Sequence, residues 1–133
     1  MKTDTAVIGT VFVDCKGFAA YRYDPLGRNI GSVKFIHGGV GRNVAENLAT
    51  AGLPVTFLSS VDDNALGREI IQRLNDKGVD TSHTETAEAA GMGIWLAVMD
   101  QDGELVSSVS QMPNLAILEE TIDKSGDEII SRT

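Results

Sequence analysis

The sequence predicts an α/β fold in which helices cover a parallel β-sheet and a second, smaller sheet projects from it. Two apolar runs, TAVIGTVFV at 5–13 and VTFLSSV at 55–61, are typical of strands buried on both faces of a parallel sheet. Helical patterns alternate with these strands, as right-handed crossovers between parallel strands require. Strand-like segments at 18–37 and 93–110 interrupt the alternation and predict the second sheet.

The first strand is expected to end at Asp14. Ligands of open α/β sheets bind at the carboxyl ends of the strands, and an ionised carboxylate there can accept hydrogen bonds from two sugar hydroxyls. Asp14 is therefore a candidate substrate-binding residue. The alternative is a solvated loop aspartate.

The next segments read as two antiparallel pairs. FAAYRY and SVKFI look like short strands around the turn-rich DPLGRNIG, within 18–37. GIWLAVMD at 93–100 and ELVSSVS at 104–110 are joined by QDG and predict a hairpin. If the two pairs join, the chain leaves the main sheet twice to build one flap above the strand ends.

The helices carry recognisable end signals. Asn43 is the expected N-cap of the first, with Glu46 placed as in a capping box, and Gly52 ends it. The second helix has N-cap candidates at 62–64 and a closing Lys77-Gly78 pair. The stretch 117–133 is also helix-like, and the sequence stops within it.

The turn HGGVGRN at 37–43 raises the question of what it holds. It does not fit GxGxxG, because position 44 is valine, and GxxxxGK[ST] is absent from the chain. Glycines 38, 39 and 41 let the backbone approach a ligand closely, and the helix that follows offers free N–H groups. A polyhydroxylated small molecule would suit such a turn. The alternative is a tight turn in which Asn43 only caps the helix.

Composition limits the partners. The 133-residue chain has a formal net charge of −8 and no Lys/Arg cluster, which disfavours nucleic acid and anionic membranes. No apolar stretch approaches the length of a membrane helix, and the one cysteine, Cys15, cannot form an intrachain disulfide. We therefore expect a cytoplasmic protein whose partners are small molecules or other proteins.

Three stretches together resemble the N-terminal half of ribokinase-like carbohydrate kinases of the PfkB type. They are VIGTVFVD, HGGVGRNVAENLATAG and VDDNALGREIIQRLNDKGVDT. The combination GGxGxN, DDxxG and LxxxGVD is far more specific than a lone glycine motif. Within that family, GSVKFIHGGVGRNVAENLA looks most similar to pseudouridine kinases, although other sugar and nucleoside kinases share much of this text.

The resemblance implies a three-layer α/β core and a small β-sheet lid, with lid strands within 18–37 and 92–110, that closes over the sugar and serves as a homodimer interface. It implies that Asp14, Gly38, Gly39 and Asn43 hold the sugar hydroxyls. It also implies transfer of the ATP γ-phosphoryl group, with Mg²⁺, to a primary hydroxyl of a sugar or nucleoside.

The chain departs from the family in one respect. The family's base aspartate, GAGD-type anion hole and ATP pocket lie in the C-terminal half, and no GAGD occurs here. We therefore expect residues 1–133 to be the N-terminal part of a ribokinase-like domain, with the C-terminal half absent and no catalytic, nucleotide-binding or metal-binding residue. Alone, the chain is expected to be inactive. The alternatives are a kinase of another sugar, or a non-catalytic module for ligand binding or dimerisation.

Overall fold

The computed structural model describes residues 5–133. Strands and helices follow one another along almost the whole of this range, and the longest connection is 20–30. In chain order the elements are β1 (Thr5–Ile8), β2 (Phe12–Ala19), β3 (Gly31–Gly38), α1 (Val40–Thr50), β4 (Val55–Asp62), α2 (Ala65–Asp76), β5 (Val79–Asp80), β6 (Thr84–Ala87), β7 (Gly93–Met99), β8 (Leu105–Gln111) and α3 (Leu115–Ser131).

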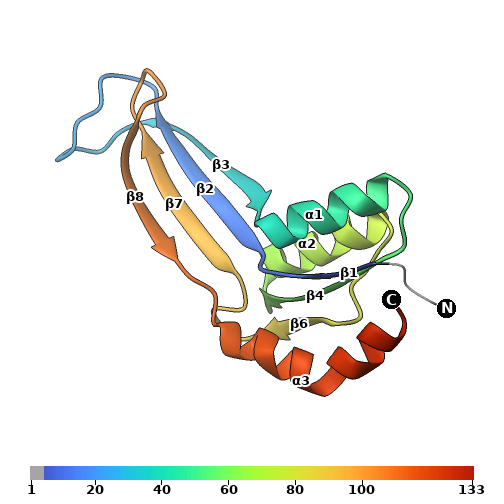
Figure 1. Ribbon diagram of the computed structural model, residues 1–133. Coiled ribbons are helices and arrows are strands. Elements are labelled where there is room, and N and C mark those ends of the chain that lie inside the picture. The colour runs from blue at the N-terminus through green and yellow to red at the C-terminus, as the bar shows by residue number, and fades with distance from the viewer. Residues whose placement is uncertain (1–4) are drawn as a thin grey trace.

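The core is a parallel sheet centred on β4. Strand β1 pairs with one edge of β4, while β5 and β6 pair with successive parts of the other edge. Helices α1 and α2 lie on one face of this sheet and α3 lies on the other, so the core has three layers (Figure 1). The predicted α/β class and parallel sheet are confirmed.

Burial explains why β4 is central. All eight of its residues are buried, and Phe57, Val61 and Val55 belong to the main apolar cluster. The helices add Ala45 from α1 together with Ile70 and Leu74 from α2, at the helical spacing that their sequences show. Burial on both faces favours a strand rich in large apolar residues, and 55–61 places Val55, Phe57, Leu58 and Val61 among the small polar residues Thr56, Ser59 and Ser60, which are buried with them.

The second sheet projects from the core as a long ribbon (Figure 1). Its strand order is β3-β2-β7-β8, with β2 parallel to β7 and the other two pairs antiparallel. We call this four-stranded sheet the flap. The expected hairpin at 93–110 is present, and it joins the pair formed by β2 and β3 in a single sheet.

The expected continuous strand at 5–13 is wrong. The chain leaves the core sheet after Ile8 and enters the flap at Phe12, so β2 begins well before position 18. At the break, an added Cβ on Gly9 would stand 2.8 Å from the Cα of Gly41, which shows how closely this connection crosses α1. Hydropathy cannot mark the break, because Val11 and Val13 are buried where the two sheets join.

The start of α1 also differs from the expectation. The N-cap is Gly39, with φ of 95° and no side-chain cap, so Asn43 lies within the first turn and forms no capping box with Glu46. In contrast, Asn64 caps α2 by accepting a hydrogen bond from the backbone N–H of Gly67, as one of the three candidates predicted. Gly78 follows α2 with φ of 88°, as the Lys77-Gly78 signal indicates.

Helix α3 starts two residues earlier than the expected helix-like stretch, because Asn114 caps it through the backbone N–H of Ala116. Among residues 5–133, no helix combines the length and apolarity that crossing a bilayer requires.

Candidate functional site

A cleft of about 620 Å³ opens where the flap meets the N-terminus of α1. Its walls combine the base of the flap, the β1–β2 connection and the glycine turn. The four substrate-binding residues expected from the sequence, Asp14, Gly38, Gly39 and Asn43, all line it. The other lining residues are Thr10, Phe12, Ile36, His37, Val40, Trp95 and Ser110.

Asp14 reaches this cleft from a different place than expected. It is the third residue of flap strand β2, not the tip of a core strand. Strand register puts Asp14 beside Ile36 on one side and Trp95 on the other, and Trp95 beside Ser110. These four residues form one row across the flap, on the face that looks into the cleft. The carboxylate is therefore part of the flap and would move with it.

The glycine turn provides the opposite wall. Gly38 is buried at the end of β3, and a Cβ added there would meet both carboxylate oxygens of Asp14 at 3.5 Å. A Cβ on Gly39 would stand 2.5 Å from the carbonyl oxygen of Thr10. The turn thus needs glycine for its close approach to the β1–β2 connection as well as for its φ. Directly after it, the first N–H groups of α1 have no partner within the helix and present its positive end.

Asn43 lies in the first turn of α1, and its position is set by its neighbour Arg42. The guanidinium of Arg42 donates to the side-chain oxygen of Asn43 and to the backbone carbonyl oxygens of Gly38 (3.0 Å) and His37 (3.2 Å). Arg42 is only 5% exposed. Glu46, one turn further along α1, accepts from Arg42 and also from Arg73 of α2.

Burial and neighbouring charges behind the turn lower the pKa values of Glu46 and His37. Burial of Glu46 opposes its ionisation, but hydrogen bonds from Arg73 and Arg42 outweigh this and lower the pKa of the Glu46 carboxyl. Burial lowers the pKa of His37, partly offset by Glu69, whose carboxylate lies 3.4 Å from Nε2. The glycine turn is therefore backed by an ionised carboxylate and a histidine that favours its neutral form.

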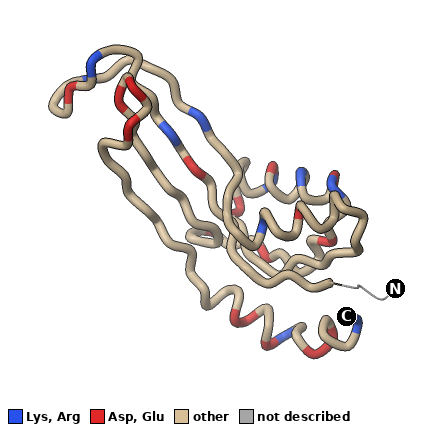
Figure 2. Tube along the Cα trace, turned by 45° about the horizontal axis from the view of Figure 1, so that its top comes forward, with Lys and Arg blue, Asp and Glu red and all other residues tan. Residues whose placement is uncertain are grey.

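The flap strands carry few charges, as Figure 2 shows. In β2 and β3 the acidic and basic side chains are Asp14, Lys16 and Lys34, and strands β7 and β8 have none. The ammonium group of Lys16 lies 5.6 Å from the centroid of the Trp95 ring. An aromatic ring at the cleft, held by a cation–π contact, is suited to a flat, partly apolar ligand group.

Sequence reasoning missed part of this cleft. The alternation along 93–100 is interpreted most simply as packing of Trp95 within the flap, with closure of one flap face over substrate as the alternative, because the pattern does not show which face looks into a cleft. Ser110 carries no local signal at all. Arg42 stands inside the GGVGRN motif and Glu46 follows at i,i+4 on the same helix, but Arg73 of α2 reaches Glu46 only through helix packing.

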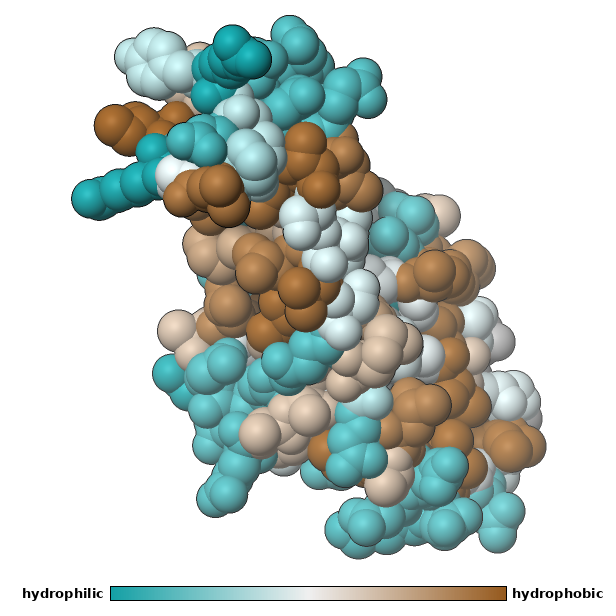
Figure 3. All heavy atoms as spheres, turned by 90° about the vertical axis from the view of Figure 1, so that its left-hand side faces the viewer, coloured by the Kyte–Doolittle hydropathy of each residue, from teal (hydrophilic) through white to brown (hydrophobic). Residues whose placement is uncertain are grey.

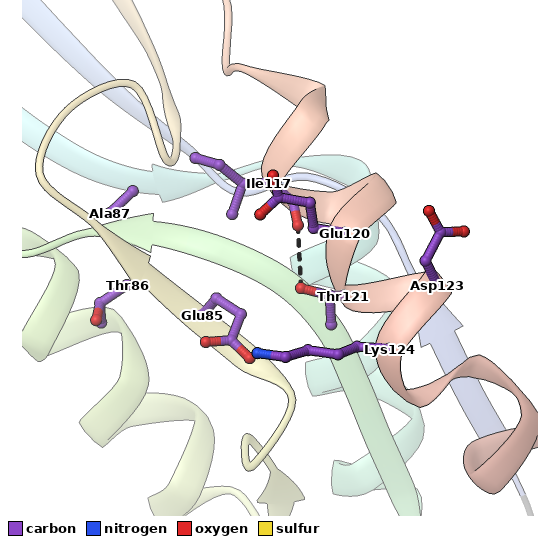
Figure 4. A pocket seen from close by; sticks show the side chains of 8 residues that line it. All are labelled: Glu85, Thr86, Ala87, Ile117, Glu120, Thr121, Asp123 and Lys124. Atoms are coloured by element: carbon purple, nitrogen blue, oxygen red, sulfur yellow. Dashed lines mark hydrogen bonds between the residues drawn. The ribbon is translucent and has the colours of Figure 1, made fainter.

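A second hollow of about 650 Å³ lies between β6 and α3, on the other side of the core (Figure 4). Glu85, Glu120 and Asp123 stand around it, and Lys124 extends across it towards Glu85. The hydroxyl of Thr121 already donates to the carbonyl oxygen of Ile117, at 3.0 Å. Although slightly larger, this hollow has no glycine turn and contains none of the four substrate-binding residues expected from the sequence, so the flap cleft remains the candidate site.

The acidic side chains at the end of β4 are engaged within the chain. Within 5–133, no group of three or more His, Cys, Asp or Glu side chains is placed to hold a metal ion. Asp62, at the end of β4, uses its carboxylate to accept from the backbone N–H groups of Gly91 and Met92, and Asp63 pairs with Arg68. The carboxylates of Asp62 and Asp63 therefore already have partners within the chain.

Comparison with known proteins gives these features a context. A guanosine-inosine kinase from Exiguobacterium acetylicum is 46% identical over 117 residues, which is 88% of this chain and 39% of that protein. The pseudouridine kinase of Escherichia coli K12 is 29% identical over 111 residues, or 84% of this chain and 36% of its own length. The guanosine-inosine kinase therefore has the higher identity, whereas the sequence around the glycine turn looks most similar to pseudouridine kinases.

Solved structures agree with the fold. A Clostridium perfringens protein named as a sugar kinase aligns with a TM-score of 0.87 and 30% identity, covering all of this chain and 42% of that one. Ribokinase from Arabidopsis thaliana, solved with ribose and ATP, aligns with a TM-score of 0.71 and 20% identity over 84% of this chain and 36% of that one. The chain therefore spans about two fifths of the length of such relatives.

The pfkB family carbohydrate kinase model matches residues 2–129, nearly the whole sequence. Members of this family are ATP-dependent kinases, and the ribose and ATP complex comes from one of the structures similar to this chain. With its three-layer parallel core, its flap and a glycine turn that opens a helix, this chain belongs to the PfkB family of carbohydrate kinases.

Proposed function

We propose that this chain forms the acceptor-binding part of an ATP-dependent kinase that phosphorylates a primary hydroxyl of a ribonucleoside. One observation carries the proposal: Asp14, Gly38, Gly39 and Asn43 line a single cleft that also contains Trp95. The carboxylate and the amide are groups that bind sugar hydroxyls, and the indole ring offers an apolar surface to a base. A free sugar has no flat apolar group to place against the ring.

The preferred acceptor is a purine ribonucleoside such as guanosine or inosine. This choice replaces the pseudouridine expectation, and it is supported by the 46% identity with the guanosine-inosine kinase against 29% with the pseudouridine kinase. Binding would orient the sugar between the flap and the N-terminus of α1, with the base towards Trp95. Pseudouridine and ribose are the competing acceptors.

The chain's own residues account for binding and not for phosphoryl transfer. Asp14 accepts hydrogen bonds from hydroxyls, the glycine turn lets the ligand approach the backbone, and closure of the flap would exclude water. The catalytic base, the anion hole and the nucleotide pocket are assigned to other parts of a complete kinase. A module that binds ligand without transferring phosphate is the second candidate, favoured by the lack of a metal-binding group within 5–133.

We further propose that two copies associate through the outer face of the flap. This face, turned away from the cleft row, consists of Val33, Phe35, Leu96 and Val109, which are 64%, 59%, 47% and 64% exposed. Figure 3, seen from the side of β8, shows apolar side chains gathered over the flap. The two copies, each with a net charge of −8, would meet through a surface without acidic or basic side chains.

The proposed activity is tested in two steps. First, the fluorescence of the one tryptophan reports binding of guanosine, inosine, pseudouridine and ribose to the 133-residue chain. We expect saturable binding that is tightest for the purine ribonucleosides, and no turnover with ATP. A chain that binds ribose as tightly as guanosine would contradict the base assignment.

The second step is the open reading frame that encodes the chain. If it continues past Thr133 into a GAGD-type sequence, its product should transfer phosphate from ATP to guanosine and inosine faster than to pseudouridine. A reading frame that stops at Thr133, with binding but no transfer, would favour the non-catalytic module.

A further inference from the structure

Arg42 is a buried cation at the start of α1, close to the cleft but not among the residues that line it. Its Nε donates to the carbonyl oxygen of Gly38, and its Nη2 donates to the carbonyl of His37 and to Oδ1 of Asn43. One side chain therefore joins the end of β3, the glycine turn and Asn43. A buried guanidinium with this many partners is well ordered.

The charge of Arg42 is not needed to neutralise Glu46. Glu46 accepts from Arg42 through Oε2 and from Arg73 of α2 through Oε1, at 3.2 Å from Nε and 3.0 Å from Nη2. If Arg42 were replaced, Glu46 would still have the guanidinium of Arg73. The structure thus offers a way to change Arg42 without leaving a buried carboxylate unpaired.

The contact with Asn43 determines the chemistry that Asn43 can offer. A guanidinium has five donors and no acceptor, so the amide atom facing it is the oxygen. The amide NH₂ of Asn43 is then turned away from Arg42, and Asn43 lines the cleft with an exposed side chain. Asp14, on the facing wall, has only acceptors when ionised. The cleft therefore presents a fixed donor on one side and a fixed acceptor on the other.

We propose that Arg42 is a positioning residue that locks the amide of Asn43 with its NH₂ towards the ligand, so that the cleft recognises two hydroxyls, one accepting from Asn43 and one donating to Asp14. The proposal rests on the nucleoside-binding function above and assigns the polarity of its sugar site. A ribose diol satisfies both groups, because each hydroxyl can donate and accept. For a deoxynucleoside that lacks the hydroxyl bound by Asn43, the orientation of the Asn43 amide does not increase the affinity.

The test compares Arg42→Met with Arg73→Met in the 133-residue chain. Arg42→Met keeps an unbranched stem but removes every donor, whereas Arg73→Met removes the other guanidinium on Glu46 and touches neither Asn43 nor the turn. Binding of guanosine, 2′-deoxyguanosine and 3′-deoxyguanosine is followed by tryptophan fluorescence. The side-chain NH₂ signals of Asn43 are followed by ¹⁵N-edited NMR. They are assigned as the signals that disappear in Asn43→Asp.

We expect Arg42→Met to weaken guanosine binding about tenfold, the value of one hydrogen bond with fixed geometry. The same variant should not weaken binding of whichever deoxynucleoside has lost the partner of Asn43, and Asn43→Asp should show this same selectivity. The Asn43 NH₂ signals should shift in unliganded Arg42→Met and stay in place in Arg73→Met. Arg42→Lys, which keeps a donor near Oδ1, should restore part of the selectivity.

Two results would overturn the proposal. One is an equal loss of affinity for guanosine and both deoxynucleosides in Arg42→Met, which indicates that Arg42 only supports the fold of the turn. The other is an Asn43 NH₂ signal that does not change when Arg42 is replaced. If the unaltered chain binds no nucleoside, the proposed function fails, while the NMR signals still decide whether Arg42 holds the amide.

Discussion

The carboxylate of Asp14 lies against the backbone of Gly38, so that a single methyl group at Gly38 would touch both carboxylate oxygens at 3.5 Å. One residue belongs to flap strand β2 and the other to the end of β3, immediately before the turn into α1. Asp14 is the one acidic side chain of β2 and β3, and this contact places it beside the glycine turn. A ligand held by Asp14 is therefore also held close to the N-terminus of α1.

Asp14→Asn should weaken nucleoside binding at least tenfold. The substitution keeps the shape but replaces an acceptor-only carboxylate with a neutral amide, and hydrogen bonds to charged groups contribute about 1.5–3 kcal/mol. Titration calorimetry with guanosine on the 133-residue chain measures the change. Glu104→Gln, the same chemical change in the exposed β7–β8 connection, is the matched control and should bind as the unaltered chain does. Equal affinities for Asp14→Asn and the control would remove Asp14 from the site.

Gly39→Ala should destabilise the fold more than Gly52→Ala does. Both glycines have positive φ, 95° and 92°, a backbone region that side chains with a Cβ rarely adopt, so alanine strains the backbone at either position. Only at Gly39 would the new Cβ also stand 2.5 Å from the carbonyl oxygen of Thr10 and 2.9 Å from the backbone nitrogen of Phe12, whereas at Gly52 nothing lies within 4 Å. We expect Gly39→Ala to lose about 2 kcal/mol more than Gly52→Ala in urea unfolding. Similar losses would show that the turn can relax away from the β1–β2 connection.

The elements that sequence patterns predict best are those whose burial is periodic along one segment. Strand β4 carries large apolar residues such as Phe57 and Leu58 because both of its faces are covered, and α2 shows Ile70 and Leu74 on one face with Asn64 as its cap. The break between β1 and β2 could not be seen, because the chain stays apolar through the joint of two sheets at Val11 and Val13. Local patterns record how buried a residue is, and they do not record against which sheet.

The site shows the same limit. Asp14, Gly38, Gly39 and Asn43 do share a cleft, yet two of the reasons for expecting them there are wrong: Asp14 does not end a core strand, and Asn43 does not cap α1. A glycine with φ of 95° takes the N-cap position, which leaves Asn43 free to face the cleft. The alignment of Trp95 with Asp14 depends on the parallel pairing of β2 with β7, which no local pattern specifies.

Stability should fall as the pH drops because of His37. Its folded-state pKa lies below the ordinary value of 6.5, mainly because of burial, so the unfolded chain takes up a proton that the folded chain resists. This contribution is complete above 6.5 and is lost as the pH falls towards the folded pKa. Urea unfolding between about pH 8 and about pH 5 measures the slope. We expect His37→Gln to flatten it.

Replacing Glu69 tests the direction in which neighbouring charge shifts the pKa of His37. Because its carboxylate raises the pKa of His37, Glu69→Gln should lower that pKa further and make the loss of stability at low pH steeper. A slope that stays the same in both variants would show that other groups control the acid response. A flatter slope in Glu69→Gln would contradict the assigned direction.

Phe35→Asp should separate the proposed dimer into monomers. Phe35 is 59% exposed on the outer face, on edge strand β3 and beside Cys15 in the sheet register, and a carboxylate there would have to be buried opposite a second acidic copy. Light scattering coupled to size exclusion measures the mass at several concentrations. Lys34→Asp places the same group on the neighbouring residue of β3, whose side chain points to the opposite face of the flap, and it should leave the dimer intact. A monomeric unaltered chain at about 100 μM, well above the concentration at which a micromolar interface is saturated, would exclude the outer face as a stable contact between copies.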